Sequence, residues 1–258
     1  MATSLHASAG RIALVTGGVR RIGRAICCAL ARHGYGVVVH GSRLDDDTRA
    51  LLQEIRTSGG PGEFVEADLA NPSAVDTLID RAAAAAGPIG LLVNNASVFE
   101  DDSVGALDAE SWDRHFAVNL RAPIFLAQAF VAQTPAGDPS IVNITDQRVR
   151  KPVPRQFSYT LTKCALDAAT VMLAQALAPR VRVNAVAPGP TLPSPRQAPV
   201  AFAAQQAALP LARGPRPEDI ADAVVYLASA MHVTGTTIPV DGGQHIAWKT
   251  PDAFGIDE

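Results

Sequence analysis

Short apolar runs recur along the chain and are separated by longer stretches with helical patterns. The runs are rich in Val, Ile and Leu and have few polar positions, which is typical of strands buried on both faces of a parallel sheet. The runs that predict strands occupy residues 11–16, 35–40, 63–68, 89–95, 140–145, 181–188 and 236–243.

The stretches between these runs predict helices. One of them ends at Gly34 and another begins at Pro72, which are residues that suit a helix end and a first helical turn. The predicted helices cover residues 22–34, 47–58, 111–116, 124–133, 156–177 and 217–230, and one more begins at residue 72. This alternation predicts one α/β domain over residues 1–258, a doubly wound Rossmann-type parallel sheet of about seven strands with helices on both faces.

One long stretch, residues 189–214, interrupts the alternation and is rich in proline and alanine. It is long and irregular for a connection inside a compact domain. Because a helix and a strand follow it, the sheet resumes after it. We therefore predict that residues 189–214, called the lid segment below, cover a substrate site and do not link two domains.

Composition and charge limit the classes of function that the protein can have. The chain is 48% hydrophobic and 18% charged with a net charge of −3, so nothing indicates a nucleic-acid or membrane partner. The three cysteines have no metal-ligand spacing and cannot form a disulfide framework. No signal peptide or membrane span is evident, and we expect a cytoplasmic protein without a metal.

Basic residues nevertheless cluster at two places. Such clusters are usually solvated faces, and a phosphate-bearing small ligand is the alternative. The two clusters are Arg20, Arg21 and Arg24, and Arg148, Arg150, Lys151 and Arg155.

The sequence TGGVRRIG, residues 16–23, lies where the first predicted strand meets the first predicted helix. This placement puts backbone N–H groups and the positive end of the helix against a phosphate, and Gly17, Gly18 and Gly23 permit close approach. The alternative is a tight turn that simply needs glycine.

The choice of cofactor is made near the end of the second predicted strand. A carboxylate there would bind the ribose hydroxyls of NAD and repel a 2′-phosphate. Residues 37–44 contain no acid, and Arg43 and Arg20 could hold a phosphate. The acids at residues 45–47 come later and favour the start of the next helix. The sequence therefore predicts NADPH over NADH.

Tyr159 and Lys163 are four residues apart on a predicted helix, so they share one face. A free phenol has a pKa of about 10 and gives up its proton poorly near neutrality. The charge of Lys163 would lower that pKa and orient the cofactor ribose, so Tyr159 is the predicted proton donor. The alternative is an exposed tyrosine and lysine on an amphipathic helix.

Together these motifs resemble the short-chain dehydrogenase/reductase family over essentially the whole chain. The matching pieces are the glycine turn, Asp68-Leu69, NNAS at residues 94–97, Asn119, Tyr159 with Lys163, and Pro188-Gly189. The resemblance implies that Asp68 and Leu69 flank adenine and that Asn119 relays protons. The cofactor-binding residues that it implies, with the cations above, are Gly17, Arg20, Arg21, Ile22, Gly23, His40, Arg43, Asp68, Leu69, Asn95, Ala96, Ser97, Tyr159, Lys163, Pro188, Gly189 and Thr191.

Two departures from the family pattern narrow the resemblance to the pteridine reductases and the bacterial dihydromonapterin reductases. Arg21 stands where the family usually has glycine, and Asp146 stands where it has serine. Phe99 lies where that group has an aromatic residue that can sandwich a pterin against nicotinamide. Phe99 could instead be a core residue, Arg21 could serve the cofactor phosphate alone, and Ser97 could bind cofactor or substrate.

Asp146 is the most informative residue of the site. A serine hydroxyl can donate to a carbonyl oxygen that becomes an alkoxide, whereas an ionised carboxylate can only accept. Either Asp146 is protonated or the substrate brings N–H donors, as a reduced pterin does beside its C=N bond. The alternative is that Asp146 caps a helix or turn.

Three functions remain open. The leading hypothesis is an NADPH-dependent reductase of the C=N bond of a dihydropterin or dihydrofolate. The second is a reductase of carbonyl compounds with a protonated Asp146, and the third is a dinucleotide-binding protein without catalysis. Related reductases are commonly tetramers or dimers, so we expect a homotetramer or homodimer. The predicted catalytic residues are Asp146, Tyr159, Lys163 and Asn119, and the predicted substrate-binding residues are Arg21, Ser97, Phe99, Asp146 and Tyr159.

Overall fold

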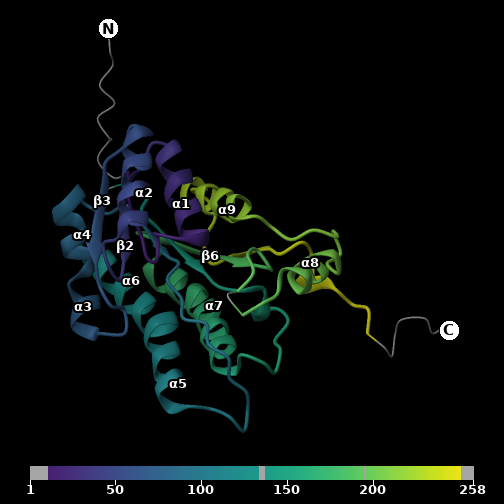
Figure 1. Ribbon diagram of the computed structural model, residues 1–258. Coiled ribbons are helices and arrows are strands. Elements are labelled where there is room, and N and C mark those ends of the chain that lie inside the picture. The colour runs from purple at the N-terminus through teal and green to yellow at the C-terminus, as the bar shows by residue number, and fades with distance from the viewer. Residues whose placement is uncertain (1–10, 134–136, 195, 251–258) are drawn as a thin grey trace.

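The computed structural model describes residues 11–133, 137–194 and 196–250 (Figure 1). Within these residues, seven strands form one sheet in the order β3-β2-β1-β4-β5-β6-β7, and neighbouring strands pair in parallel. The strands are β1 (Ile12–Val15), β2 (Gly36–Gly41), β3 (Gly62–Glu66), β4 (Leu91–Asn94), β5 (Ser140–Ile144), β6 (Arg182–Pro188) and β7 (Thr237–Val240). The predicted doubly wound sheet is confirmed.

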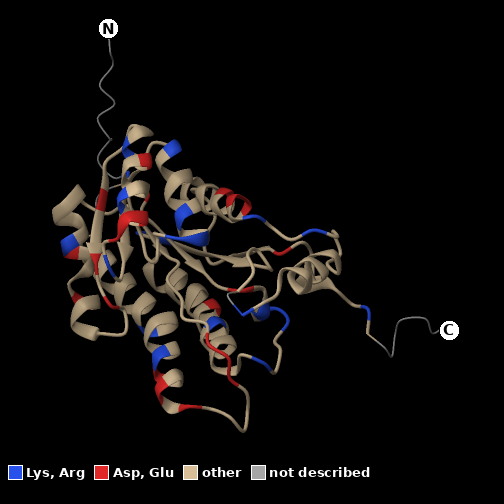
Figure 2. Cartoon of the chain, in the orientation of Figure 1, with Lys and Arg blue, Asp and Glu red and all other residues tan. Residues whose placement is uncertain are grey.

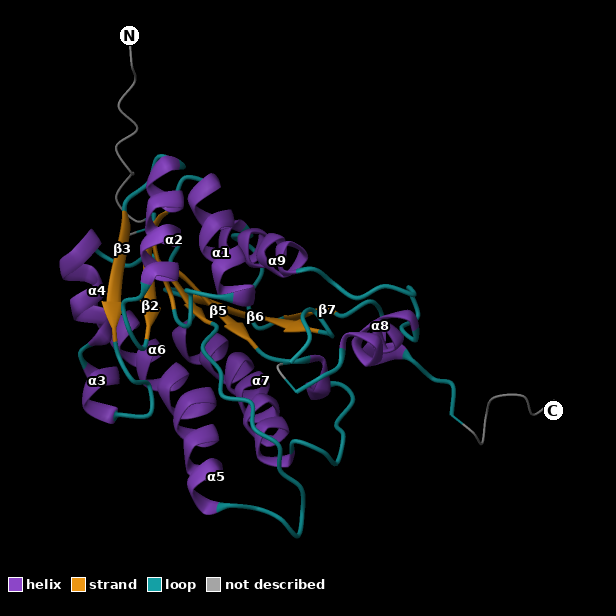
Figure 3. Cartoon of the chain, in the orientation of Figure 1, coloured by secondary structure: helices purple, strands orange, loops and turns teal. Residues whose placement is uncertain are grey.

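Helices cover both faces of the sheet (Figure 3). They are α1 (Arg21–Arg32), α2 (Asp46–Thr57), α3 (Pro72–Asp76), α4 (Leu78–Ala86), α5 (Ala109–Phe116), α6 (Ala122–Gln133), α7 (Phe157–Leu177), α8 (Pro199–Ala207) and α9 (Pro217–Ser229). Residues of α1, α2 and α9 form one core cluster against the sheet, and residues of α3, α4, α6 and α7 form the other.

Strand β1 shows why these runs are continuously apolar. Its side chains alternate between the two faces, so Ala13 and Val15 join the first core cluster while Ile12 and Leu14 join the second. All four residues are buried. A strand with helices on both faces has no solvated side, and its sequence therefore lacks the polar alternation of a half-exposed strand.

The structure corrects the predicted elements in three places. The last strand ends at Val240, because Gly242 and Gly243 adopt positive φ angles and turn the chain away. The helix predicted from Pro72 is divided into α3 and α4. The lid segment is not wholly irregular, since α8 lies within it and has proline in its first turn followed by alanines that favour helix.

The helical segment Ala109–Gln133 runs through α5, a π-helical turn η1 (Ala117–Arg121) and α6. By length and mean hydropathy it is the one candidate for a membrane span in the described part of the chain. Ala122, Leu126 and Phe130 of this segment are buried in the second core cluster, as in a core helix of a globular domain. Acidic and basic residues are interspersed over the fold (Figure 2).

Candidate active site

The carboxyl ends of the central strands open onto a cavity of about 1090 Å³. Its wall is made by the loops that follow β1 to β6, which is the place where ligands bind in doubly wound sheets. Every predicted site residue lines this cavity except Arg43 and Asn119. No group of three His, Cys, Asp or Glu side chains suited to a metal occurs within the described ranges.

The glycine turn is fastened to the end of β4. Thr16 Oγ1 accepts hydrogen bonds from the backbone N–H groups of Asn95 and Ala96, and the Asn95 amide donates to the carbonyl oxygens of Thr16 and Gly17. A Cβ atom at Gly23 would lie 2.2 Å from Gly17 O, so only glycine fits there. The turn is therefore held in a shape that leaves its backbone close to any ligand in the cavity.

His40 supports the turn from β2. Its Nδ1 accepts from Gly17 N at 3.1 Å, so the ring proton is on Nε2 and is donated to Ala67 O at 3.1 Å. Burial lowers the pKa of His40 to about 4, and the ring is neutral near pH 7. His40 lines the cavity, and its two hydrogen bonds join the end of β2 to the loops that follow β1 and β3.

The two arginines predicted to hold a phosphate have different places. Arg20 lines the cavity and pairs with Asp45 at 2.7 Å and Asp47 at 3.1 Å. Arg43 lies outside the cavity wall, with Asp45 at 3.6 Å. Asp45 also caps α2 by accepting from Thr48 N, which confirms that these acids serve the start of the helix.

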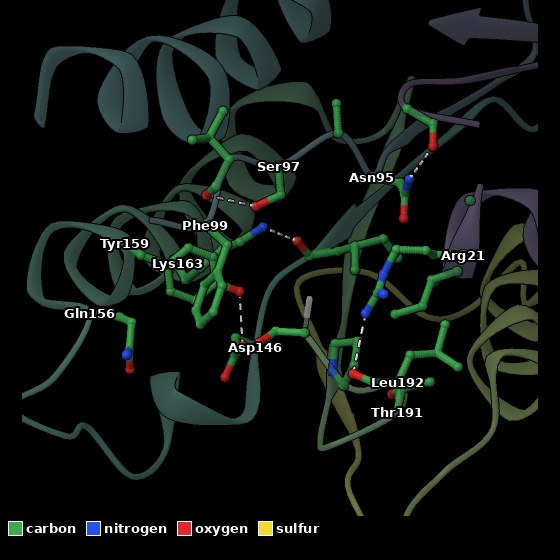
Figure 4. A pocket seen from close by; sticks show the side chains of 18 of the residues that line it. Arg21, Asn95, Ser97, Phe99, Asp146, Gln156, Tyr159, Lys163, Thr191 and Leu192 are labelled. Atoms are coloured by element: carbon green, nitrogen blue, oxygen red, sulfur yellow. Dashed lines mark hydrogen bonds between the residues drawn. The ribbon is translucent and has the colours of Figure 1, made fainter. Parts of the chain in front are cut away.

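Arg21 adopts a left-handed backbone with φ of 54°. This conformation explains why glycine is favoured at the position, since a side chain there is strained. The guanidinium donates to Leu192 O at 3.2 Å (Figure 4) and to Pro193 O at 3.0 Å, and both acceptors are in the lid segment. Arg21 thus joins the glycine turn to the lid segment across the cavity.

Asp146, Tyr159 and Lys163 meet at the end of β5. Tyr159 Oη donates to Asp146 Oδ2 at 2.9 Å (Figure 4), and Lys163 Nζ donates to Ile144 O at 2.8 Å. Tyr159 is only 7% exposed and Lys163 only 2%. The alternative of an exposed Tyr-Lys pair on an amphipathic helix is therefore wrong.

Burial changes the acidity of all three groups. It raises the pKa of Asp146 and raises the pKa of Tyr159 well above its ordinary value, to which the neighbouring Asp146 also contributes. Burial lowers the pKa of Lys163 to about 8. The Tyr159 phenol therefore keeps its proton near neutral pH, and the lowering of its pKa that we expected from Lys163 is outweighed by burial and by Asp146.

Asp146 has two distinct contacts. Oδ1 accepts from Arg148 N at 2.9 Å and caps the 3₁₀ turn η2 (Gln147–Val149), while Oδ2 accepts from the Tyr159 phenol. Asp146 therefore does cap a turn, which was the alternative role that the sequence left open for it. It leaves the second oxygen at the cavity wall, so capping and a role in the site are compatible.

Phe99 and Ser97 both line the cavity. The Phe99 ring meets the Tyr159 ring edge to face, with 4.7 Å between centroids, and it is not a core residue. Ser97 Oγ contacts Val98 O at 3.4 Å. Asn119 lies in η1 behind the wall, where its amide binds the backbone of Val98. Its relay role stays a prediction.

Four arginines of the cavity wall were not among the predicted site residues: Arg114, Arg148, Arg155 and Arg196. Arg148 places its guanidinium carbon 5.5 Å from the Phe99 ring centroid and 5.6 Å from that of Tyr159. Arg196, in the lid segment, donates to Phe99 O and pairs with Glu100 at 2.8 Å. Arg148 could have been found from its place two residues after Asp146, whereas no local signal indicates Arg196.

Comparison with known proteins identifies the class. A family model described as enoyl-(acyl carrier protein) reductase matches residues 17–245. A short-chain type dehydrogenase/reductase from Picea abies is 34% identical, covering 91% of this chain and 92% of that protein. The 3-oxoacyl-(acyl-carrier-protein) reductase FabG of Staphylococcus aureus strain Mu50 is 32% identical, covering 91% and 98%. The chain belongs to the short-chain dehydrogenase/reductase family and is an oxidoreductase.

Two solved structures are closer in sequence. FolM alternative dihydrofolate reductase 1 from Brucella suis, in complex with NADP, is 51% identical with a TM-score of 0.91, covering 95% of this chain and 98% of that one. The protein of the same name from Brucella canis, complexed with NADP, is 50% identical with a TM-score of 0.91, covering 98% and 100%.

Proposed function

We propose that this protein is an NADPH-dependent reductase that converts a dihydropterin or dihydrofolate to its tetrahydro form. The observation that carries the proposal is the partly buried hydrogen bond from the Tyr159 phenol to Asp146 Oδ2 at 2.9 Å. A carboxylate in this place suits a substrate that offers N–H groups. The similarity to two FolM dihydrofolate reductases at about half identity supports the same substrate class.

The cavity fits a nicotinamide dinucleotide phosphate. Gly17 and Gly23 leave their backbone free to approach a pyrophosphate, and the space that a Cβ atom would occupy at Gly23 is already filled. Arg20 supplies a cation on the wall near the end of β2, where residues 37–44 contain no acid. When bound, this cofactor would supply the hydride.

The residues of this chain would deliver the proton to the substrate. Reduction of a C=N bond adds a hydride to the carbon and a proton to the nitrogen, so the protein must deliver one proton. Tyr159 is the donor that we propose, and Asp146 accepts an N–H group of the substrate or passes a proton to the phenol. Lys163 holds a positive charge behind the ring, with Nζ at 5.7 Å from the Tyr159 centroid.

A second candidate is reduction of a carbonyl group. The observation that favours it is the burial of Asp146, which raises the pKa of the carboxyl and stabilises its protonated form. A protonated Asp146 could donate a hydrogen bond to a developing alkoxide as a serine does. The two candidates share the fold, the cofactor and Tyr159, and they differ in what Asp146 gives to the substrate.

Initial rates of NADPH oxidation separate these candidates. The enzyme should turn over dihydromonapterin, dihydrobiopterin or dihydrofolate, and Tyr159→Phe serves as the matched inactive control. A panel of ketones tests the second candidate under the same conditions. Turnover on ketones with none on the dihydropterins or dihydrofolate would contradict our proposal. Tight NADPH binding without turnover of either class would favour a non-catalytic dinucleotide-binding protein.

We also propose that the enzyme works as a homotetramer or homodimer in the cytoplasm. Support for association comes from large apolar side chains that are exposed on the helices of one face, among them Phe125 of α6 and Met172 of α7. Light scattering in solution measures the assembly. A protein that stays monomeric over a wide concentration range would contradict the proposed assembly but not the proposed reaction.

A further inference from the structure

Arg148 is placed beside the catalytic pair by a turn that Asp146 itself caps. Strand β5 ends at Ile144, and the 3₁₀ turn η2 begins one residue after Asp146. The hydrogen bond from Arg148 N to Asp146 Oδ1, at 2.9 Å, closes this turn. The side chain of Arg148 is therefore carried to the cavity wall, whereas Arg150 and Lys151 of the same basic cluster are exposed outside it.

Two aromatic rings contact the guanidinium. Its central carbon lies 5.5 Å from the centroid of Phe99 and 5.6 Å from that of Tyr159, both within the cation–π range of about 6 Å. The two rings also meet each other edge to face at 4.7 Å. Arg148, Phe99 and Tyr159 thus form one cluster, and movement of any one of them changes the surroundings of the phenol.

The charge of Arg148 is not neutralised by an ion pair. Within the described part of the chain, its buried Nη1 has no hydrogen-bond partner, whereas the wall residues Arg20 and Arg196 pair with acids. A partly buried cation without a paired carboxylate is costly, and the faces of the two rings offset only part of the cost. Such an arrangement is typical of an active site and not of a stabilising surface contact.

We propose that Arg148 is a positioning residue of the reductase site, which holds the rings of Phe99 and Tyr159 and keeps a permanent positive charge beside the Asp146–Tyr159 pair. The inference rests on the proposed reductase function, but it requires only that Tyr159 gives the proton. It adds a second cation to the one supplied by Lys163. Among the described residues, the titratable and charged groups near the pair are Arg148 from η2, Lys163 and Cys164 from α7, and His115 from α5. The His115 ring centroid lies 6.4 Å from that of Tyr159, and burial lowers the pKa of His115.

The two cations differ in how long they keep their charge as the pH rises. Burial lowers the pKa of Lys163 to about 8, so its ammonium group begins to lose its proton there. A guanidinium stays protonated throughout the working range. The charge of Arg148 opposes the effect of burial and lowers the pKa of Asp146 and of Tyr159. The pair therefore remains able to give up a proton when Lys163 is neutral.

Three variants test this role. Arg148→Met removes the charge and keeps most of the length, Arg148→Lys keeps the charge without the planar group, and Arg150→Met removes an exposed cation two residues away. For Arg148→Met we expect kcat at pH 7 to fall roughly tenfold, with an NADPH Kd within about twofold of the wild type. Arg150→Met should match the wild type in both.

The pH profile distinguishes positioning from support of the fold. Loss of the Arg148 charge raises the pKa of Asp146 and of Tyr159, so the alkaline limb of kcat should move up by about one pH unit in Arg148→Met. In Arg148→Lys, the alkaline fall of kcat should occur at the same pH as in the wild type. Only part of the value of kcat should be restored, because an ammonium group stacks less well on two rings. If the alkaline fall of kcat occurs at the same pH in every variant, the inference is overturned.

A second readout does not require turnover. The chain has three tyrosines, so fluorotyrosine labelling gives three fluorine NMR signals, and the one missing in Tyr159→Phe belongs to Tyr159. The titration of this signal should move to higher pH in Arg148→Met and stay unchanged in Arg150→Met. Equal titrations would overturn the inference, even in a wild type that reduces pterins. If no dihydropterin or dihydrofolate is turned over, the proposed substrate fails while this titration still decides the role of Arg148.

Discussion

The phenol of Tyr159 donates to one oxygen of Asp146 at 2.9 Å, and the other oxygen of the same carboxyl group accepts from the backbone of Arg148 at 2.9 Å. The turn that ends β5 and the helix that carries Tyr159 are thereby joined through one side chain. Asp146 cannot rotate toward a substrate without breaking one of these two bonds. Its place at the site is fixed before any ligand binds.

Replacement of Tyr159 by phenylalanine tests the proton donor. Tyr159→Phe removes the hydroxyl and keeps the ring against Phe99, so we expect kcat to fall by about 10²–10⁴-fold while the Kd for NADPH changes little. Steady-state rates and fluorescence titration with NADPH measure the two quantities. Unchanged turnover would mean that another group supplies the proton.

Replacement of Asp146 separates its two contacts. Asp146→Asn keeps an oxygen that can cap η2, whereas Asp146→Ser offers only a hydroxyl. We expect both variants to lose pterin reduction by more than they lose NADPH affinity, because each lacks a carboxylate for the substrate N–H group. Initial rates with a dihydropterin and NADPH titrations provide the comparison. Equal losses of rate and cofactor affinity would indicate a structural role.

The stability of the protein should depend on pH through His40. Burial lowers its folded-state pKa from 6.5 to about 4, so the unfolded chain binds the extra proton first as the pH falls. Stability is therefore lost as the pH drops from 6.5 toward 4, by up to about 3 kcal/mol from this group. Urea unfolding at a series of pH values measures the loss.

His40→Leu is the matched variant for this prediction. It should be less stable at pH 7, because Gly17 N loses its acceptor, and its stability should fall less between pH 6.5 and 4. Some dependence should remain, since burial also lowers the pKa of His115. An unchanged slope in His40→Leu would show that His40 does not control the loss.

Arg21→Gly tests the strained residue of the glycine turn. Glycine tolerates φ of 54°, so we expect the free energy of unfolding to stay equal or to rise by up to about 1 kcal/mol. The contacts with Leu192 and Pro193 are lost, and the KM for the pterin should rise. Thermal melting and steady-state kinetics check both parts. A strongly destabilised variant would show that the lid contacts support the fold.

Much of the scaffold follows from local sequence. Continuous apolar runs predict strands such as β1 because both of its faces are covered, and the turn of residues 16–23 needs glycine at Gly17 and Gly23, where a Cβ atom would collide with backbone atoms. The pair of Tyr159 and Lys163 follows from helical spacing alone. These features depend on residues that are close together in the sequence, and so the sequence predicts them.

The groups that long side chains contact could not be predicted from local sequence. Arg20 lines the cavity and Arg43 does not, although both stood near the expected phosphate. Asn119 binds the Val98 backbone behind the wall, and Arg148, which the sequence places in a basic cluster, contacts two aromatic rings. Each outcome depends on groups that are distant in sequence, and a flexible side chain has many partners within reach until the fold excludes most of them.

The order of the sheet has a consequence for synthesis on the ribosome. Strand β1 precedes every other strand of the sheet in the chain, yet it lies near the middle of the sheet between β2 and β4. One of its edges therefore stays unpaired until residues Leu91–Asn94 emerge, and this edge belongs to an entirely apolar strand. A nascent chain halted before that point exposes an unpaired apolar strand edge to which other chains can bind, so the interval between synthesis of β1 and of β4 is when protection by chaperones matters most.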